Sequence, residues 1–209
     1  MIKYQLEKLG GLKAMGNFNK FLIVLIVIMA GITVFQIFWS FSRRPNFTQV
    51  YYRATYIFSD TDETTMDHVA RFAFKKYEDF RKTLDNFQNY PQDEKKKAYA
   101  DVMQRLSKDI GQEIQVISYN STATEYEGLL QIHELGVVKG FIKQSQDGTK
   151  EISLGDNEIN LSGDSKITFI LPKNSQILEV IPEPSERKEN VLIWNLQGKM
   201  KFPKVIYKY

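Results

Sequence analysis

A run of apolar residues without a single charge occupies positions 21 to 39, and the spacing of apolar residues after it becomes alternating or helical. At a rise of about 1.5 Å per residue, a helix of this length covers about 28 Å, close to the roughly 30 Å hydrocarbon thickness of a bilayer. The pattern predicts a transmembrane signal anchor over 21–41. Its anchoring residues are Phe21, Leu22, Ile23, Val24, Leu25, Ile26, Val27, Ile28, Met29, Ala30, Gly31, Ile32, Thr33, Val34, Phe35, Gln36, Ile37, Phe38 and Trp39.

Two other interpretations of this run compete with a membrane span. A buried helix of a soluble protein needs polar positions along one face, and Thr33 and Gln36 are the only ones here. A cleaved signal peptide needs a small-residue cleavage site, whereas Ser40, Phe41 and Ser42 follow the run. The sequence therefore favours an uncleaved anchor.

Basic residues on the two sides of the span predict its orientation. Those before the run are Lys3, Lys8, Lys13 and Lys20, and those shortly after it are Arg43, Arg44 and Arg53. With the α-amino group, this bias predicts a cytoplasmic N-terminus and an extracytoplasmic domain over 47–209. Residues 1–20 form a basic cytoplasmic tail, for which an interfacial helix and a disordered segment both remain open.

The exterior domain begins with a predicted strand and continues with a predicted helical hairpin. Residues 47–58 are rich in aromatic and β-branched side chains, which is typical of a strand. Three- and four-residue spacings then predict two helices within 65–110, the first with Thr64 and Asp67 as a capping box. The apolar positions of the first helix are Val69, Ala73, Tyr77, Phe80, Leu84 and Phe87. Phe72 and Phe74 lie off this stripe and form either more core or a surface for an envelope or membrane protein partner.

The segment 113–209 consists of short β runs separated by turn residues. Strands are predicted over 114–119, 125–133, 137–143, 167–171, 177–181, 191–196 and 204–207. Asp147 with Gly148 predicts a hairpin turn, and Ser162, Gly163 and Asp164 predict another. The predicted fold class is α+β: a single N-terminal transmembrane helix, then an exterior domain with a helical hairpin and an antiparallel sheet or sandwich.

One segment of the β-rich part carries a recognisable pattern. In ILPKNSQILEVIPEPSERKENVLIWNL (170–196), the positions that define it are Leu171, Pro172, Pro182, Pro184 and Trp194. This pattern resembles the end of exported β-domains of thermophilic bacteria and archaea, which belong to families of unknown function and carry one N-terminal membrane anchor. The resemblance implies an exported β-rich fold with structural roles for these five residues, and it implies no activity.

Charge and cysteine content narrow the possible partners. The chain holds 28 Lys or Arg and 25 Asp or Glu, but residues 1–48 contain six of the basic residues and one of the acidic ones. The remaining 22 basic and 24 acidic residues leave the exterior domain without a basic excess, so no nucleic-acid partner is predicted. The absence of cysteine excludes disulfides, cysteine zinc sites and thiol catalysis. No cofactor is expected.

Candidate chemical groups are few. His68 and His133 are the only histidines and lack metal-binding spacing, so the sequence predicts a capping or exposed role for each. Four residues with side-chain oxygens lie close together and are a weak candidate for a calcium site. The segment lacks the glycine of an EF-hand loop, however, and fits an ordinary polar hairpin as well. These residues are Asp156, Glu158, Asn160 and Asp164.

Two sets of charged residues have a structural interpretation as well as a chemical one. Asp60, Asp62 and Glu63 include the paired carboxylates that a glycosidase needs, yet they also fit a solvated loop before a helix N-terminus. The lysines at positions 95–97 fit the solvated face of the second helix. No residue is assigned a catalytic role.

The sequence therefore predicts the fold class and the cellular location of this protein better than its activity. The leading hypothesis is a non-enzymatic binding or assembly component of the cell envelope, tethered to the lipid bilayer by its anchor. The first alternative is a membrane-anchored hydrolase that uses carboxylates or calcium in the β-rich half. The second is a bitopic sensor, whose short cytoplasmic tail would need a partner to carry a signal.

Overall fold

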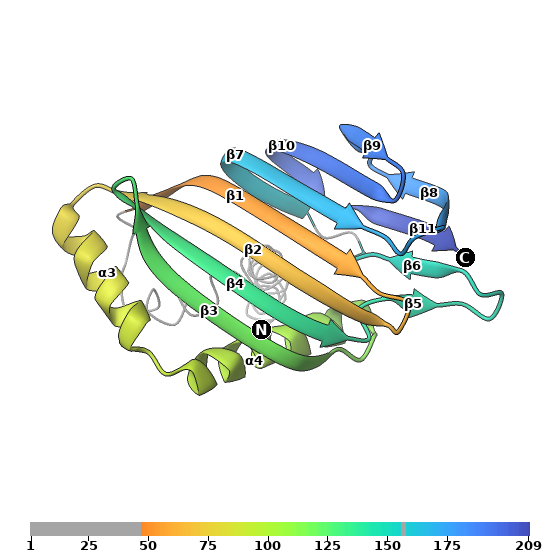
Figure 1. The fold of residues 1–209 in the computed structure, drawn as a ribbon, viewed down its shortest axis with the longest axis horizontal. Coiled ribbons are helices and arrows are strands. Elements are labelled where there is room, and N and C mark those ends of the chain that lie inside the picture. Colours follow the sequence, from red (N-terminus) through yellow and green to blue (C-terminus); the bar gives the residue numbers. More distant parts are fainter. Residues whose placement is uncertain (1–46, 156–157) are drawn as a thin grey trace, which may run out of the picture.

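The computed structural model describes residues 47–155 and 158–209, so the predicted span and the tail before it lie outside the described residues. The described chain is an α+β domain with a seven-stranded sheet, a four-stranded sheet and two helices. Figure 1 shows the helices along the β3 side of the large sheet and the small sheet near the ends of β1 and β7.

The large sheet is mixed. In spatial order its strands are β3 (Gln115–Tyr126), β4 (Leu129–Lys139), β2 (Glu63–Phe74), β1 (Phe47–Phe58), β7 (Glu158–Ile170), β10 (Val191–Lys201) and β9 (Glu186–Lys188). Neighbouring strands are antiparallel except for β1 and β7, which are parallel. A purely antiparallel sheet was the sequence prediction, and the parallel pair differs because the long chain between Phe58 and Glu158 allows a crossover.

The small sheet is antiparallel. Its strands, in order, are β5 (Lys143–Gln144), β6 (Lys150–Ile152), β11 (Lys204–Lys208) and β8 (Gln176–Ile181). The β5–β6 hairpin turns at Asp147 and Gly148, as predicted, with Thr149 donating backbone and hydroxyl hydrogen bonds to the Asp147 carboxylate. The strands predicted over 177–181 and 204–207 are confirmed as β8 and β11.

The prediction of a helix from residue 65 is wrong for its first part, because residues 63–74 form strand β2. The buried side chains of β2 alternate, and two of them are polar, Thr64 and His68. These polar members hide the period of two, so the apolar residues alone mimic a helical spacing. Thr64 and Asp67 therefore lie three residues apart on opposite faces of one strand and do not form a capping box.

The two helices are α3 (Tyr77–Asn89) and α4 (Gln92–Ile110). Phe80, Leu84 and Phe87 of α3 are buried, as the helical spacing predicts for this part of the chain. Helix α4 ends at Gly111, whose left-handed conformation (φ 66°) suits a residue without Cβ. Within the part of the chain that the structure describes, neither helix is long and apolar enough to cross a bilayer.

Strands β3 and β4 form a hairpin whose turn lies inside the strand predicted over 125–133, so that prediction is wrong at its start. The turn lies at Glu127 and Gly128, because both residues adopt positive φ angles there. Residues 134–136, expected between two strands, lie inside β4. Gly136 is required at its position because a Cβ would stand 2.6 Å from the Tyr99 hydroxyl oxygen, which packs on the backbone at this point.

One face of the large sheet is buried from β3 to β10, whereas the edge strand β9 is exposed. The helices pack on β3 and β2, and an aromatic cluster fills the space between the large sheet and the segments around the small one. Within this cluster, the ring of Tyr56 lies 5.2 Å from that of Phe169, and Phe169 lies 5.0 Å from Trp194. Trp194 also donates a hydrogen bond from Nε1 to the Pro182 carbonyl at 2.9 Å. Leu171 and Trp194 thus have the structural roles that the sequence pattern implies.

Side chains from the helices shield the outer edge of β3. Gln88 and Gln92 donate Nε2 hydrogen bonds to the carbonyls of Ala123 and Ser121, at 3.0 and 2.6 Å. Lys96 Nζ donates to the carbonyl of Ile117 at 3.3 Å. These residues recur every four positions and occupy acceptors that a second strand would otherwise use. We infer that this edge is closed to strand addition.

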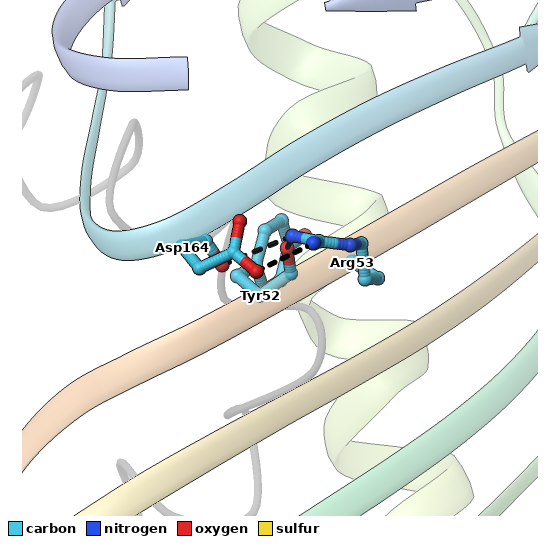
Figure 2. A network of polar contacts seen from close by, with 3 residues as sticks. All are labelled: Tyr52, Arg53 and Asp164. Atoms are coloured by element: carbon cyan, nitrogen blue, oxygen red, sulfur yellow. Dashed lines mark hydrogen bonds and ion pairs between the residues drawn. The ribbon is translucent and has the colours of Figure 1, made fainter. Parts of the chain in front are cut away.

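The junction between β1 and β7 joins the two halves of the large sheet. Arg53 on β1 donates to the carboxylate of Asp164 at 2.7 Å, to the Asp164 carbonyl at 3.0 Å and to the Tyr52 carbonyl at 3.1 Å (Figure 2). The predicted turn at 162–164 is wrong, because these residues lie inside β7. The turn-like composition instead marks an irregularity in the pairing of β7 with β10.

Gly163 allows the backbones of β1 and β7 to approach at this junction. Its φ is 72°, and a Cβ would collide with the carbonyl oxygen of Val50, where the pairing of β1 with β2 is also irregular. Two independent reasons thus favour glycine here: the left-handed backbone and the lack of space.

We expect Gly163→Ala to destabilise the domain more than Gly148→Ala. Both glycines have positive φ, but a Cβ at Gly148 meets open space. At both positions the left-handed backbone makes alanine less stable than glycine by about 1 kcal/mol. At Gly163 the collision with Val50 lowers the free energy of unfolding by roughly 2 kcal/mol more. Chemical unfolding of the full chain in detergent, followed by near-ultraviolet circular dichroism, measures both losses. Equal losses would contradict the close approach.

Candidate functional site

The second face of the large sheet, here called the open face, is the candidate functional site. Its side chains are half-buried or exposed, whereas those of the opposite face are buried under the helices and the small sheet. Strand alternation creates this division, since successive residues point to opposite faces. The open face carries two chemically different ends.

The arginine end consists of Tyr51, Arg53, Arg71 and Tyr126. The guanidinium carbon of Arg71 lies 4.3 Å from the ring centroid of Tyr51 and 3.7 Å from that of Tyr126, so it is held between two rings. Its Nε donates to Gln131 Oε1 at 2.8 Å. Arg53 also contacts Tyr51, at 4.5 Å from the centroid. Ring contacts of this kind orient a cation without neutralising it.

The two arginines differ in their charge partners. Arg53 is paired with Asp164, and its hydrogen bond lowers the pKa of that carboxyl below the ordinary value. Arg71 is paired with no carboxylate within residues 47–155 and 158–209, and its two terminal nitrogens have no acceptor there. Arg71 is therefore a preorganised cation whose remaining donors face solvent or a ligand.

The apolar end lies at the opposite ends of the same strands. It consists of Ile57, Leu135, Val137, Ile170 and Val191. Register places Ile57 beside Ile170, which in turn lies beside Val191 on β10. Ile57 on β1 and Leu135 on β4 are each 43% exposed, and Thr65 and Asp67 of β2 lie between them in the register. Exposed branched apolar side chains on a face that no other described element covers are typical of a binding surface.

His133 lies between the two ends and is paired with Asp67. Its Nε2 is 2.7 Å from Asp67 Oδ1, across adjacent strands β4 and β2. Both side chains are 45% exposed, so water screens the pair and its contribution to stability is small. The sequence prediction of an exposed His133 is confirmed, although the residue lies inside β4 and not at a strand end.

A second group of ionisable side chains is buried beneath the sheet. Tyr119 donates a hydrogen bond to Glu134 Oε1 at 2.6 Å, while Glu134 Oε2 has no hydrogen-bond partner among the described residues. Burial raises the pKa of Glu134 and lowers that of Lys95, whose Nζ lies 4.2 Å from the Phe87 ring. The expectation that residue 95 belongs to a solvated helix face is therefore wrong for Lys95, because α4 turns it toward the sheet.

His68 belongs to this interior as well. It is opposite Glu134 in the register of β2 and β4, and its ring lies 5.2 Å from Tyr56 and 6.1 Å from Tyr52. The predicted position in a helical turn is wrong, since His68 is a buried strand residue. Burial lowers the pKa of His68 to about 4, so the imidazole is neutral at pH 7.

The remaining sequence candidates do not gather at one place. Asp60, Asp62 and Glu63 lie in or beside the β1–β2 turn, where Ser59 N donates to the Glu63 carbonyl, and no helix begins there. Of the calcium candidates, Asp164 is paired with Arg53, Asp156 lies outside the described residues, and Glu158 and Asn160 belong to β7. No group of three or more His, Asp or Glu among the described residues is placed to hold a metal ion.

Sequence inspection missed Glu134 and the role of Arg71. The positions Leu130, Ile132, Glu134, Gly136 and Val138 alternate, and this period would have placed Glu134 on the buried face. Arg71 is missed because the sequence predicts a helix from residue 65, whereas the residue lies on strand β2. Its ring partners come from β1 and β3, which no local pattern connects to β2.

The fold and this site define a β-rich α+β domain with one buried and one open sheet face. The chain belongs to the family described as domain of unknown function (DUF4897), which matches residues 47–208. Membership of an uncharacterised family agrees with the resemblance drawn from residues 170–196. No curated protein matches the sequence.

Two solved structures are similar to the domain at low sequence identity. The folded domain of the LppM protein of Mycobacterium tuberculosis, determined by NMR, is 10% identical with a TM-score of 0.46, over 80% of this chain and 94% of that one. A crystal structure from Parabacteroides distasonis is 5% identical with a TM-score of 0.27, over 78% of this chain and 40% of that one. At these TM-scores neither similarity bears on activity.

We expect His68→Gln to change how stability depends on pH. In the wild type the unfolded imidazole, with a pKa near 6.5, takes up a proton before the folded one, whose pKa is about 4. Wild-type stability therefore falls as the pH drops from 6.5 to 4, by up to about 3 kcal/mol, and the variant lacks this loss. Unfolding free energies of both proteins across this range measure the difference. Parallel curves would contradict a neutral buried His68.

Proposed function

We propose that this chain is a single-pass membrane protein whose domain acts outside the cytoplasm as a non-enzymatic binding or assembly component of the cell envelope. The observation that carries the proposal is the open face, a sheet surface that no other part of 47–155 and 158–209 covers, with an apolar end and an arginine end. Residues 21–41 are the proposed span and residues 1–20 the cytoplasmic tail, because the run is uncharged and basic residues dominate before it.

Tethering is the proposed mechanism. The strand that begins at Phe47 follows the proposed span after only residues 42–46, so the domain stays close to the bilayer. Confinement to the membrane surface raises the effective concentration of the domain toward other membrane or envelope proteins. A weak contact at the open face is then sufficient for assembly.

The apolar end is the surface that we assign to a protein partner. Ile57 and Leu135 expose branched side chains there, and burying such surface on association is favourable. The sequence suggested the helical hairpin as the partner surface because of Phe72 and Phe74. Both residues lie on β2 and not on a helix, and Phe72 is buried while Phe74 packs against the core, so they no longer point to the helices as a partner surface.

A hydrolase and a sensor have less support. Glu134 and His68 lie on the buried face, and the sheet separates them from the open face. The His133 and Asp67 pair is exposed on a face that offers it no enclosure, whereas acid–base catalysis depends on a partly water-excluded site. A sensor would use the same open face but needs a cytoplasmic partner to transmit a signal.

We expect single-cysteine labelling to show the proposed orientation. The natural chain has no cysteine, so Lys13→Cys and Gln104→Cys each introduce one unique site. A membrane-impermeant maleimide added to intact cells with a single membrane should label Cys at 104 on α4, and should label Cys at 13 only after permeabilisation. The reverse pattern would overturn the orientation.

We expect a photocrosslinker placed at Asn120 to capture a protein neighbour in intact membranes, because Asn120 is exposed and lies opposite Leu135. Leu135→Glu should reduce capture at least about fivefold, since it places a charge in the apolar contact. Leu178→Glu is the matched control, because Leu178 is 47% exposed but lies on β8 of the other sheet.

Two results would count against the proposed surface. Capture from Gln104 on α4 and none from Asn120 would restore the helical hairpin as the interface. Hydrolysis of an envelope polymer or ester by the purified chain, abolished by one carboxylate substitution, would replace the binding function with an enzymatic one.

A further inference from the structure

The arginine end lies at the end of the sheet where the chain leaves its proposed anchor. Tyr51 is four residues after Phe47, a distance of about 13 Å along a strand, whereas Ile57 is about 20 Å further on. Because β2 runs antiparallel to β1, its last residue Phe74 pairs with Phe47, and Arg71 pairs with Tyr51. Figure 1 shows this end of β1 beside the start of α3 and the β3–β4 turn.

Other groups at this end suit a membrane surface. Lys75 and Lys76 connect β2 to α3, whose first residue is Tyr77. All three are exposed, and the Tyr77 ring is stacked 5.6 Å from that of Phe80. Tyr126 is 38% exposed. Tyrosines and aromatic rings of this kind favour the interface between lipid head groups and hydrocarbon, and basic side chains favour lipid phosphates.

Acidic residues lie near this end too. Glu125 and Glu127 belong to the β3–β4 hairpin or its turn, and Glu78 lies in the first turn of α3. A large net positive charge therefore does not drive the contact. Attraction depends instead on the local placement of Arg71, which is stacked between two rings, oriented by Gln131 and unpaired with any carboxylate of the described residues.

We propose that the arginine end docks on the membrane that holds the anchor and that Arg71 binds the phosphate groups of its lipids. The terminal nitrogens of Arg71 donate to phosphate oxygens, and Tyr51 and Tyr126 hold the guanidinium plane in place. Docking turns the arginine end toward the bilayer and leaves the apolar end, farther along the strands, for the protein partner. This inference rests on the proposed anchor.

The test uses the full chain in lipid nanodiscs that contain phosphatidylcholine alone or with added phosphatidylglycerol. A fluorophore is attached to Thr124→Cys, which lies opposite Gln131 on the open face, or to Gln104→Cys on α4 as the positional control. Lipids that carry a quencher at the head group report contact. Quenching at position 124 should increase with phosphatidylglycerol and exceed that at 104.

Substitution of Arg71 isolates its contribution. Arg71→Gln should lower the ratio of docked to undocked domain about fivefold in phosphatidylglycerol discs, the effect of one interfacial arginine. Arg105→Gln, on an exposed position of α4, removes the same charge and should leave the ratio unchanged. Arg71→Lys retains charge without the stacked plane and should fall between wild type and Arg71→Gln, and near-ultraviolet circular dichroism confirms that each variant is folded.

Each remaining outcome bears on a defined part of the proposal. Equal quenching at 124 and 104, or quenching independent of phosphatidylglycerol and of Arg71, would overturn docking. Binding of inorganic phosphate by the chain, with no quenching at position 124 in phosphatidylglycerol discs, would assign the site to a soluble phosphate and overturn the lipid source. A chain that does not copurify with the nanodiscs would overturn the anchor itself, whereas a copurifying chain without quenching would overturn only the docking.

Discussion

The parallel pairing of β1 with β7 is the constraint on which the rest of the structure depends. It joins strands β1 to β4 to strands β7, β10 and β9. Without this pairing the large sheet would be two separate sheets. Gly163 permits the close approach, and Arg53 connects both strands through Asp164. Because parallel neighbours cannot be joined by a tight turn, the helices and β5–β6 are contained within one long crossover.

This arrangement explains why the two faces of the sheet differ. The crossover and the C-terminal strands return to one face and bury it. Among the described residues, the buried aromatic cluster around Tyr56 and Phe169 therefore lies on that face alone. On the open face, polar side chains pair with each other while they remain accessible to water, as His133 and Asp67 do. An open sheet face beside a covered one is common in antiparallel sheets, but here it also carries exposed branched side chains.

Much of the local structure follows from the sequence, and the failures have a common cause. Strand β1, the helical positions Phe80 to Phe87 and the hairpin at Asp147 are each determined by neighbouring residues. Strand β2 is not, because His68 and Thr64 occupy buried positions that are normally apolar, and only the surrounding tyrosines and strands make those positions acceptable. The burial of Lys95 likewise depends on Phe87 and Glu134, which lie on different elements.

The sequence by itself determined the uncharged run that predicts an anchor, the β-rich α+β class and the absence of cysteine chemistry, because these depend on composition and short-range periodicity. Only the tertiary structure decided which residues form the candidate site. The rings that hold Arg71 belong to Tyr51, which is 20 residues before it in the sequence, and to Tyr126, which is more than 50 residues after it. Contacts between such distant residues depend on strand order and register, and no local pattern of one chain encodes these directly.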